Sequence, residues 1–88
     1  MTYMLWDGED HKWFKERYDN ITDARKSAYR RKCLTTEVCA VKGRDADIVG
    51  TVMNKNYNMY GRPIYITNTD NPTAYYLNPD GSLGKKVD

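Results

Sequence analysis

The chain has few of the residues on which catalysis and metal binding usually depend. Its 88 residues include one histidine, His11, and two cysteines, Cys33 and Cys39. The cysteines lie six positions apart, and no further Cys or His stands at zinc-binding spacing. We therefore expect two reduced thiols that act as small apolar side chains, with a disulfide between them as the alternative.

Known catalytic motifs are absent as well. The sequence contains no phosphate-binding loop, dinucleotide fingerprint, HExxH or GxSxG pattern, and it has only two serines. A nucleophile, a base and an electrostatic stabiliser are therefore hard to assemble. Glu9, Asp10 and His11 together could bind a metal ion, but a solvated hairpin turn explains the same residues. We expect a protein that is not an enzyme and has no cofactor and no metal.

Long apolar runs are also absent. No stretch approaches the 18 or more residues of a membrane span, and residues 1–6 lack the pattern of a signal peptide. We expect a cytoplasmic protein that does not bind membranes. The 14 cationic and 12 acidic residues leave a net charge of only +2, which argues against a general polyanion-binding protein. The 40% of apolar residues is typical of a folded chain, and the length predicts a single domain over residues 1–88.

The clearest element that is present is a helix predicted for residues 21–32. Asn20 can cap its first turn, and Asp23 stands at the position that completes a capping box. Small apolar residues follow the i, i+3, i+7 spacing of one buried face: Ile21, Ala24 and Ala28. Because this face is narrow, the helix can lie close to a sheet.

The rest of the chain alternates turns with short segments rich in β-favouring residues. Strands are predicted over residues 2–6, 12–18, 37–41, 48–53, 63–67, 73–77 and, as a frayed edge strand, 82–86. The predicted fold class is α+β, a small single domain in which a mostly antiparallel sheet of about five or six strands, built from hairpins, packs against one helix in the order β-β-α-β-β-β-β. One helix covers only one face, so the other face, expected to bear tyrosines, is left solvated or used for association.

Two groups of residues are candidate binding sites. The first is the Asn-rich loop over residues 54–61 together with Arg62, which follows it. The candidate protein-binding residues are Tyr57, Met59, Tyr60 and Arg62. The alternative is that these rings fold back and fill the end of the sheet. Trp6 and Trp13 are expected to pair across the first hairpin.

The second group is the helix itself, because five of the eight residues from 25 to 32 are cationic. The candidate nucleic-acid-binding residues are Arg25, Lys26, Tyr29, Arg30, Arg31 and Lys32, whose cations are expected to project away from the sheet. The alternative is a solvated outer face, since cations near a helix C-terminus are favourable without a partner.

Residues 18–24, Tyr-Asp-Asn-Ile-Thr-Asp-Ala, loosely resemble the helix start of the amino-terminal arm-binding domains of phage integrases. That family places a helix with an aromatic-x-Thr-x-x-acid-Ala start after a short antiparallel sheet, and here Asn20 takes the cap position. The match covers about a third of the chain. In that family the sheet contacts DNA, so the resemblance implies basic first strands, which Glu16 between Lys15 and Arg17 fits only in part.

The leading hypothesis from the sequence is a non-catalytic binding module that associates with another protein or with itself. The alternative is a nucleic-acid-binding accessory protein that uses the basic helix from Arg25 to Lys32. The identity of the partner does not follow from the residues.

Overall fold

A computed structural model describes the whole chain, Met1–Asp88. Its elements follow the order β1 (Thr2–Asp7), β2 (Lys12–Trp13), α1 (Ile21–Arg30), β3 (Thr35–Lys42), β4 (Asp45–Met53), the 3-10 helix η1 (Lys55–Tyr57), β5 (Ile64–Thr67), β6 (Ala74–Leu77) and β7 (Leu83–Lys86). The strands form one antiparallel sheet in the spatial order β2-β1-β3-β4-β5-β6-β7. The α+β class with the sheet packed on one helix is confirmed. The sheet has seven strands, where the sequence predicts about five or six, since the expected frayed edge strand forms β7 and pairs with β6.

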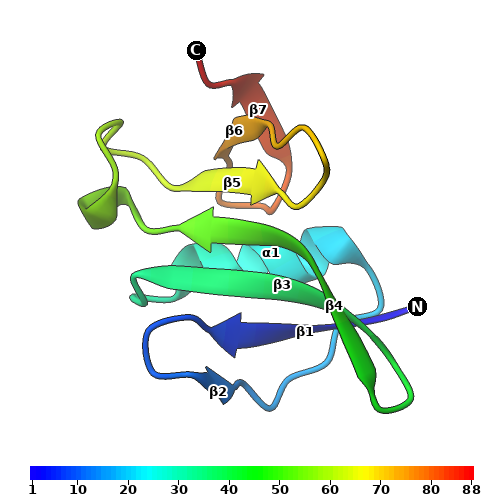
Figure 1. Cartoon of the computed structure of the whole chain (residues 1–88). Helices are drawn as coiled ribbons and strands as arrows, with labels where there is room; N and C mark the ends of the chain where they lie inside the picture. Colours follow the sequence, from blue (N-terminus) through cyan, green and yellow to red (C-terminus); the bar gives the residue numbers. More distant parts are fainter.

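The molecule has two layers, a twisted sheet and a single helix. Figure 1 looks at the side of the sheet without the helix, and α1 lies behind β3 and β4. The helix packs against β1, β3 and β4. Side chains that alternate along the strands point toward it and form the core with Ala24 and Ala28: Leu5, Val38, Val52, Tyr65 and Leu77. The predicted buried face of the helix is therefore confirmed.

The helix begins where the sequence predicts and ends earlier. The Asn20 side-chain oxygen accepts a hydrogen bond from the Asp23 N–H at 2.8 Å, which confirms the predicted cap. The predicted end at Lys32 is wrong, because Arg31 is already extended, with φ −73° and ψ 145°. The Asn54 amide, which follows β4, donates to the Arg31 carbonyl at 3.5 Å. No helix of the structure has the length and apolar character needed to cross a membrane.

The first hairpin departs from the predicted strand over residues 12–18, since β2 comprises only Lys12–Trp13. The Phe14 N–H still donates to the Leu5 carbonyl at 3.0 Å, and the chain then leaves the sheet. It returns at Tyr18, which pairs with Tyr3. Phe14 packs against the core, as expected after Trp13 on the opposite face, and residues 15–17 are the part of the predicted strand that does not pair with β1.

Candidate interaction surfaces

Arg25 does not project away from the sheet, contrary to the expectation from the sequence. Its Nε donates to the Gly81 carbonyl at 2.8 Å, and its guanidinium carbon lies 5.2 Å from the centre of the Tyr65 ring. The helical position places this side chain on the flank of α1, within reach of the β6–β7 turn. Arg25 therefore connects the helix to the far half of the sheet and is occupied by contacts within the chain.

Arg31 is also held within the chain. Its guanidinium carbon lies 3.9 Å from the centre of the Phe14 ring, and Nη2 lies 3.3 Å from a Glu16 carboxylate oxygen. The ion pair is partly exposed and contributes little by itself, whereas the cation–π contact covers a core ring. The remaining cations of the candidate set, Lys26, Arg30 and Lys32, are exposed, and Tyr29 is half-buried against the core.

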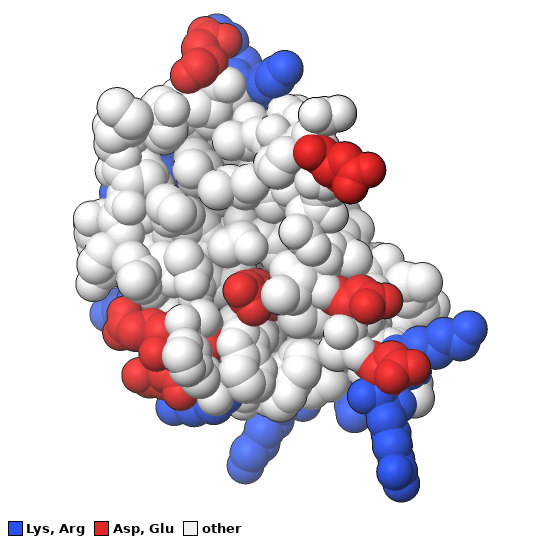
Figure 2. Space-filling view, in the orientation of Figure 1, with Lys and Arg blue, Asp and Glu red and all other residues white.

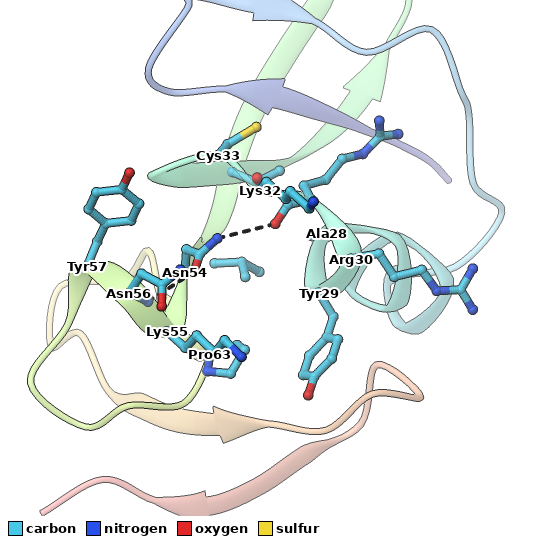
Figure 3. Close-up of a pocket in the computed structure, with 13 residues that line it drawn as sticks. Ala28, Tyr29, Arg30, Lys32, Cys33, Asn54, Lys55, Asn56, Tyr57 and Pro63 are labelled. Carbon is cyan, nitrogen blue, oxygen red and sulfur yellow. Dashed lines mark hydrogen bonds between the residues drawn. The ribbon is translucent and has the colours of Figure 1, made fainter.

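A hollow of about 420 Å³ lies between the end of α1 and the loop around η1. It brings parts of both candidate sites together, because Tyr29, Lys32 and Tyr57 all line it. Figure 3 shows Tyr29 and Tyr57 on opposite sides, with the Arg30 side chain pointing away. No Asp or Glu lines the hollow, whose lining residues are Ala28, Tyr29, Arg30, Arg31, Lys32, Cys33, Thr36, Val52, Asn54, Lys55, Asn56, Tyr57 and Pro63.

The two cysteines are free, and neither thiol is activated. Burial raises the pKa of Cys33, and hydrogen bonding and charge from Asp7 raise this pKa further. Burial raises the pKa of Cys39 to about 11, and the charge of Glu37 adds to the effect. Both thiols are therefore protonated at neutral pH, which is the unreactive state of the side chain.

Asp7 lies at the end of β1 and is buried. One of its carboxylate oxygens accepts the N–H groups of Glu9 and Asp10 at 2.9 and 3.1 Å. The hydrogen bond from Asp10 N–H, with a smaller contribution from Glu9, lowers the pKa of Asp7 against the effect of burial. Asp7 therefore shapes the hairpin turn, and no group of three or more potential metal ligands is found around it or elsewhere.

The aromatic loop faces two sides of the molecule. Tyr57 lines the hollow, and Met59, which is 88% exposed, lies outside any packed cluster. The Tyr60 ring packs edge-on against Tyr76 with centroids 6.1 Å apart, and the Arg62 guanidinium carbon lies 4.3 Å from the centre of the same ring. Tyr60 therefore folds back onto the end of the sheet, whereas Tyr57 and Met59 are exposed.

The face of the sheet opposite α1 is largely apolar and has no second layer over it. Trp6 and Trp13 pair on it with ring centroids 5.0 Å apart and an interplanar angle of 74°, which confirms the predicted cross-strand pair. We name this surface the open face, and its cross-strand rows are Trp13-Trp6-Glu37-Thr51-Ile66-Ala74, Met4-Cys39-Ile48 and Met53-Ile64-Tyr76. Only Tyr76 among these is a tyrosine, so the expected tyrosine-bearing surface is instead built from Trp, Met and Ile. The alternation along each predicted strand indicates which of its residues share a face, but not how the strands are ordered.

Figure 2 views the open face directly and shows that its centre is mostly free of charged side chains. Trp13 and Ile48 are 43% and 39% exposed. Glu37 is the one charged residue in the three rows, and no cation forms an ion pair with it. Cys39 and Ile64 of these rows are buried. The rest of the surface combines partly or fully accessible apolar side chains with one carboxylate that lacks a partner.

A second hollow, of about 450 Å³, lies on the open face near the start of β1. Apolar side chains that include Met4, Trp13 and Val41 line it together with charged residues. The charged lining residues are Lys15 and Arg17 from the chain between β2 and α1, and Arg44 and Asp45 from the β3–β4 hairpin. We name this feature the basic-rimmed hollow.

Comparisons with protein-family models, with curated proteins and with solved structures found no match to this chain. The resemblance to integrase arm-binding domains stays a prediction from residues 18–24.

Proposed function

We propose that this protein is a non-catalytic, cytoplasmic binding module that associates with another protein through the open face. The observation that carries the proposal is the apolar composition of that face where the fold supplies no covering layer. A sheet face of this kind normally packs against a second layer. A partner that covers it removes exposed Trp, Met and Ile side chains from water.

The residue types on the open face support a protein as the partner. Trp, Tyr, Met and Arg are enriched at the centres of protein interfaces. Trp6 and Trp13 form one such cluster, and Tyr60, Arg62 and Tyr76 form another at the opposite edge. Of the four candidate protein-binding residues, Tyr60 and Arg62 adjoin the open face, whereas Tyr57 borders the hollow beside α1.

The experiment that tests this proposal is site-specific photo-crosslinking in the cells that produce the protein. A photoreactive phenylalanine analogue replaces Met53 or Ile66 on the open face, and a matched control replaces Lys26 on the exposed side of α1. We expect defined protein adducts from the open-face positions and none from position 26. The proposal fails if positions 53 and 66 give no adducts, or give the same adducts as position 26.

We propose nucleic acid as the second candidate partner, and the observation that favours it is the hollow beside α1. Lys32 and Lys55 line this hollow together with two tyrosine rings, and no acidic residue is present to repel phosphates. The test records amide chemical shifts upon addition of a mixed-sequence DNA duplex at low and at physiological salt. Shifts at residues 29–33 and 54–57 that persist at physiological salt would support this candidate, and their absence would remove it.

Variants for that test must avoid the arginines that the fold uses. Arg25 and Arg31 contact Tyr65 and Phe14, so their substitution would perturb folding. Lys32→Glu with Lys55→Glu changes the hollow without breaking any hydrogen bond or ion pair of these side chains. We expect this double variant to lose duplex binding while its free energy of unfolding stays close to that of the wild type.

A further inference from the structure

Glu37 is the one charged residue in the three rows of the open face, and its neighbours on that face offer no counter-ion. It pairs with Trp6 of β1 on one side and with Thr51 of β4 on the other. Thr35 and Cys39 lie two positions away along β3 and share its face. None of these four neighbours is cationic, and Glu37 forms no ion pair within the chain. While the open face is uncovered, only water balances this carboxylate.

A partner that covers the open face removes that water. The row that contains Glu37 lies between the row that begins at Met4 and the row that begins at Met53. A partner that packs on these apolar rows therefore covers the carboxylate between them as well. Burial of an isolated carboxylate is strongly unfavourable, and a cation that also donates hydrogen bonds offsets this cost. The association therefore requires a cation from the partner at Glu37.

The position of Trp6 beside Glu37 favours arginine as this cation. Directly opposite residues on neighbouring strands have Cβ atoms about 4.5–5.5 Å apart, so the indole and the carboxylate reach the same ligand group. A guanidinium group is planar, stacks on an aromatic face and donates two parallel hydrogen bonds to a carboxylate. The ammonium group of lysine is a compact, strongly hydrated point charge and lacks this geometry.

The chain already contains an arginine held in this way elsewhere. The guanidinium carbon of Arg31 lies 3.9 Å from the centre of the Phe14 ring, and its Nη2 lies 3.3 Å from a carboxylate oxygen of Glu16. An aromatic ring and a carboxylate thus hold one guanidinium between them. Trp6 and Glu37 present the same two groups on the open face, where no arginine of the chain pairs with the carboxylate.

We propose that the open face recognises an arginine of its protein partner, whose guanidinium stacks on Trp6 and pairs with Glu37. Apolar side chains that flank this arginine in the partner pack against Met4 and Met53. This inference rests on the proposed function, because it names the chemistry of the partner that covers the same surface. A segment without a cation does not meet the requirement that Glu37 sets.

The first test repeats the photo-crosslinking from position 66 in a Glu37→Gln background. Ile66 lies in the same row as Glu37, two strands or about 10 Å away, so the crosslinker leaves Trp6 and Glu37 free. We expect the yield of the adduct to fall at least about tenfold, because a covered arginine then lacks its carboxylate. The matched control Glu9→Gln removes the same charge from the exposed β1–β2 turn and keeps the wild-type yield. Circular dichroism and urea unfolding verify that both variants fold.

The second test identifies the cation with synthetic peptides of the form acetyl-Leu-X-Leu-amide, in which X is arginine, lysine or citrulline. Citrulline has the shape of arginine without its charge. Tryptophan fluorescence reports binding at this site, because Trp6 and Trp13 are the only tryptophans and both lie on the open face. We expect the arginine peptide to bind in the millimolar range, at least about tenfold more tightly than the citrulline peptide and more tightly than the lysine peptide. Glu37→Gln should abolish the advantage of arginine.

Four results would overturn the inference: a yield from position 66 that Glu37→Gln does not change, no saturable binding of any peptide in the millimolar range, binding that does not depend on X, or an advantage of arginine that persists in Glu37→Gln. Equal binding of the lysine and arginine peptides would refute the contact with Trp6. Adducts that form independently of Glu37 would leave the proposed function standing. The absence of adducts from positions 53 and 66 would contradict the proposed function itself, so the two failures are distinguishable.

Discussion

At the scale of single residues, Gly81 has the most demanding position in the chain. Its φ of 89° favours glycine, and a side chain there would collide with the Thr22 carbonyl and the Lys26 backbone nitrogen. Gly61, with φ 66°, has open space around it and is a matched control. We expect Gly81→Ala to lower the free energy of unfolding by about 2–3 kcal/mol and Gly61→Ala by about 1 kcal/mol. Urea unfolding of both variants checks this, and equal losses would contradict the packing of the β6–β7 turn on α1.

The buried carboxylate of Asp7 makes stability depend on pH. Its pKa is lowered in the folded state, mainly by the Asp10 N–H, so its contribution is complete above the unfolded-state pKa of about 3.9 and is lost as the pH falls through the folded-state pKa. The pKa of Asp80 is lowered by Ser82, which acts in the same direction. We expect the free energy of unfolding to fall between about pH 5 and about pH 2, and to fall less in Asp7→Asn. Urea titrations at several pH values across this range give the pH dependence of the free energy of unfolding for the wild type and for Asp7→Asn. The same pH dependence in both proteins would exclude Asp7 as the cause.

At the scale of elements, Ala28 tests the contact between helix and sheet. It is 2% exposed and packs in the core, so an aspartate there would be an unpaired charge in an apolar layer. We expect Ala28→Asp to cost about 3–4 kcal/mol or to prevent folding. Lys26→Asp, two residues earlier on the exposed side, is expected to cost less than about 1 kcal/mol. Thermal and urea unfolding compare the two variants, and a similar stability for both would refute the assigned helix face.

The elements also show which patterns in the sequence determine structure. The Asn20 cap and the spacing of Ala24 and Ala28 predict the helix correctly, because both depend on local geometry alone. The strand expected over residues 12–18 ends at Trp13 and pairing resumes only at Tyr18, and Arg31 packs over Phe14 between them. Such a contact joins residues far apart in the sequence, so no local pattern reveals it.

The candidate sites were harder to predict for the same reason. A run of cations predicts a basic face, but Arg25 and Arg31 bind to Gly81 and Glu16 on neighbouring segments. The open face was foreseeable as uncovered, because one helix covers only one side of a sheet. Its rows depend on strand order and register, which the alternation within each strand does not specify.

At the scale of the whole molecule, the helix covers the sheet unequally. It packs against β1, β3 and β4, whereas β6 and β7 reach it through Leu77 and Leu83 at the edge of the core, through Arg25 and through the turn at Gly81. β7 is an edge strand and pairs only with β6. Segments with fewer buried contacts open at lower free energy than the core around them. The β6–β7 hairpin is therefore expected to open more readily than the centre of the sheet.

Native-state hydrogen exchange tests this gradient. We expect the slowest amide exchange in β3 and β4, where both edges are paired and α1 lies on one face, and faster exchange in β6 and β7. Arg25→Ala should increase exchange in β6 and β7 further and leave β3 nearly unchanged, because it removes the hydrogen bond to the Gly81 carbonyl. Lys26→Ala, whose side chain is exposed, is the control. Uniform protection across all strands would instead mean that the sheet unfolds as one cooperative unit, with Arg25 contributing no more to β7 than to β3.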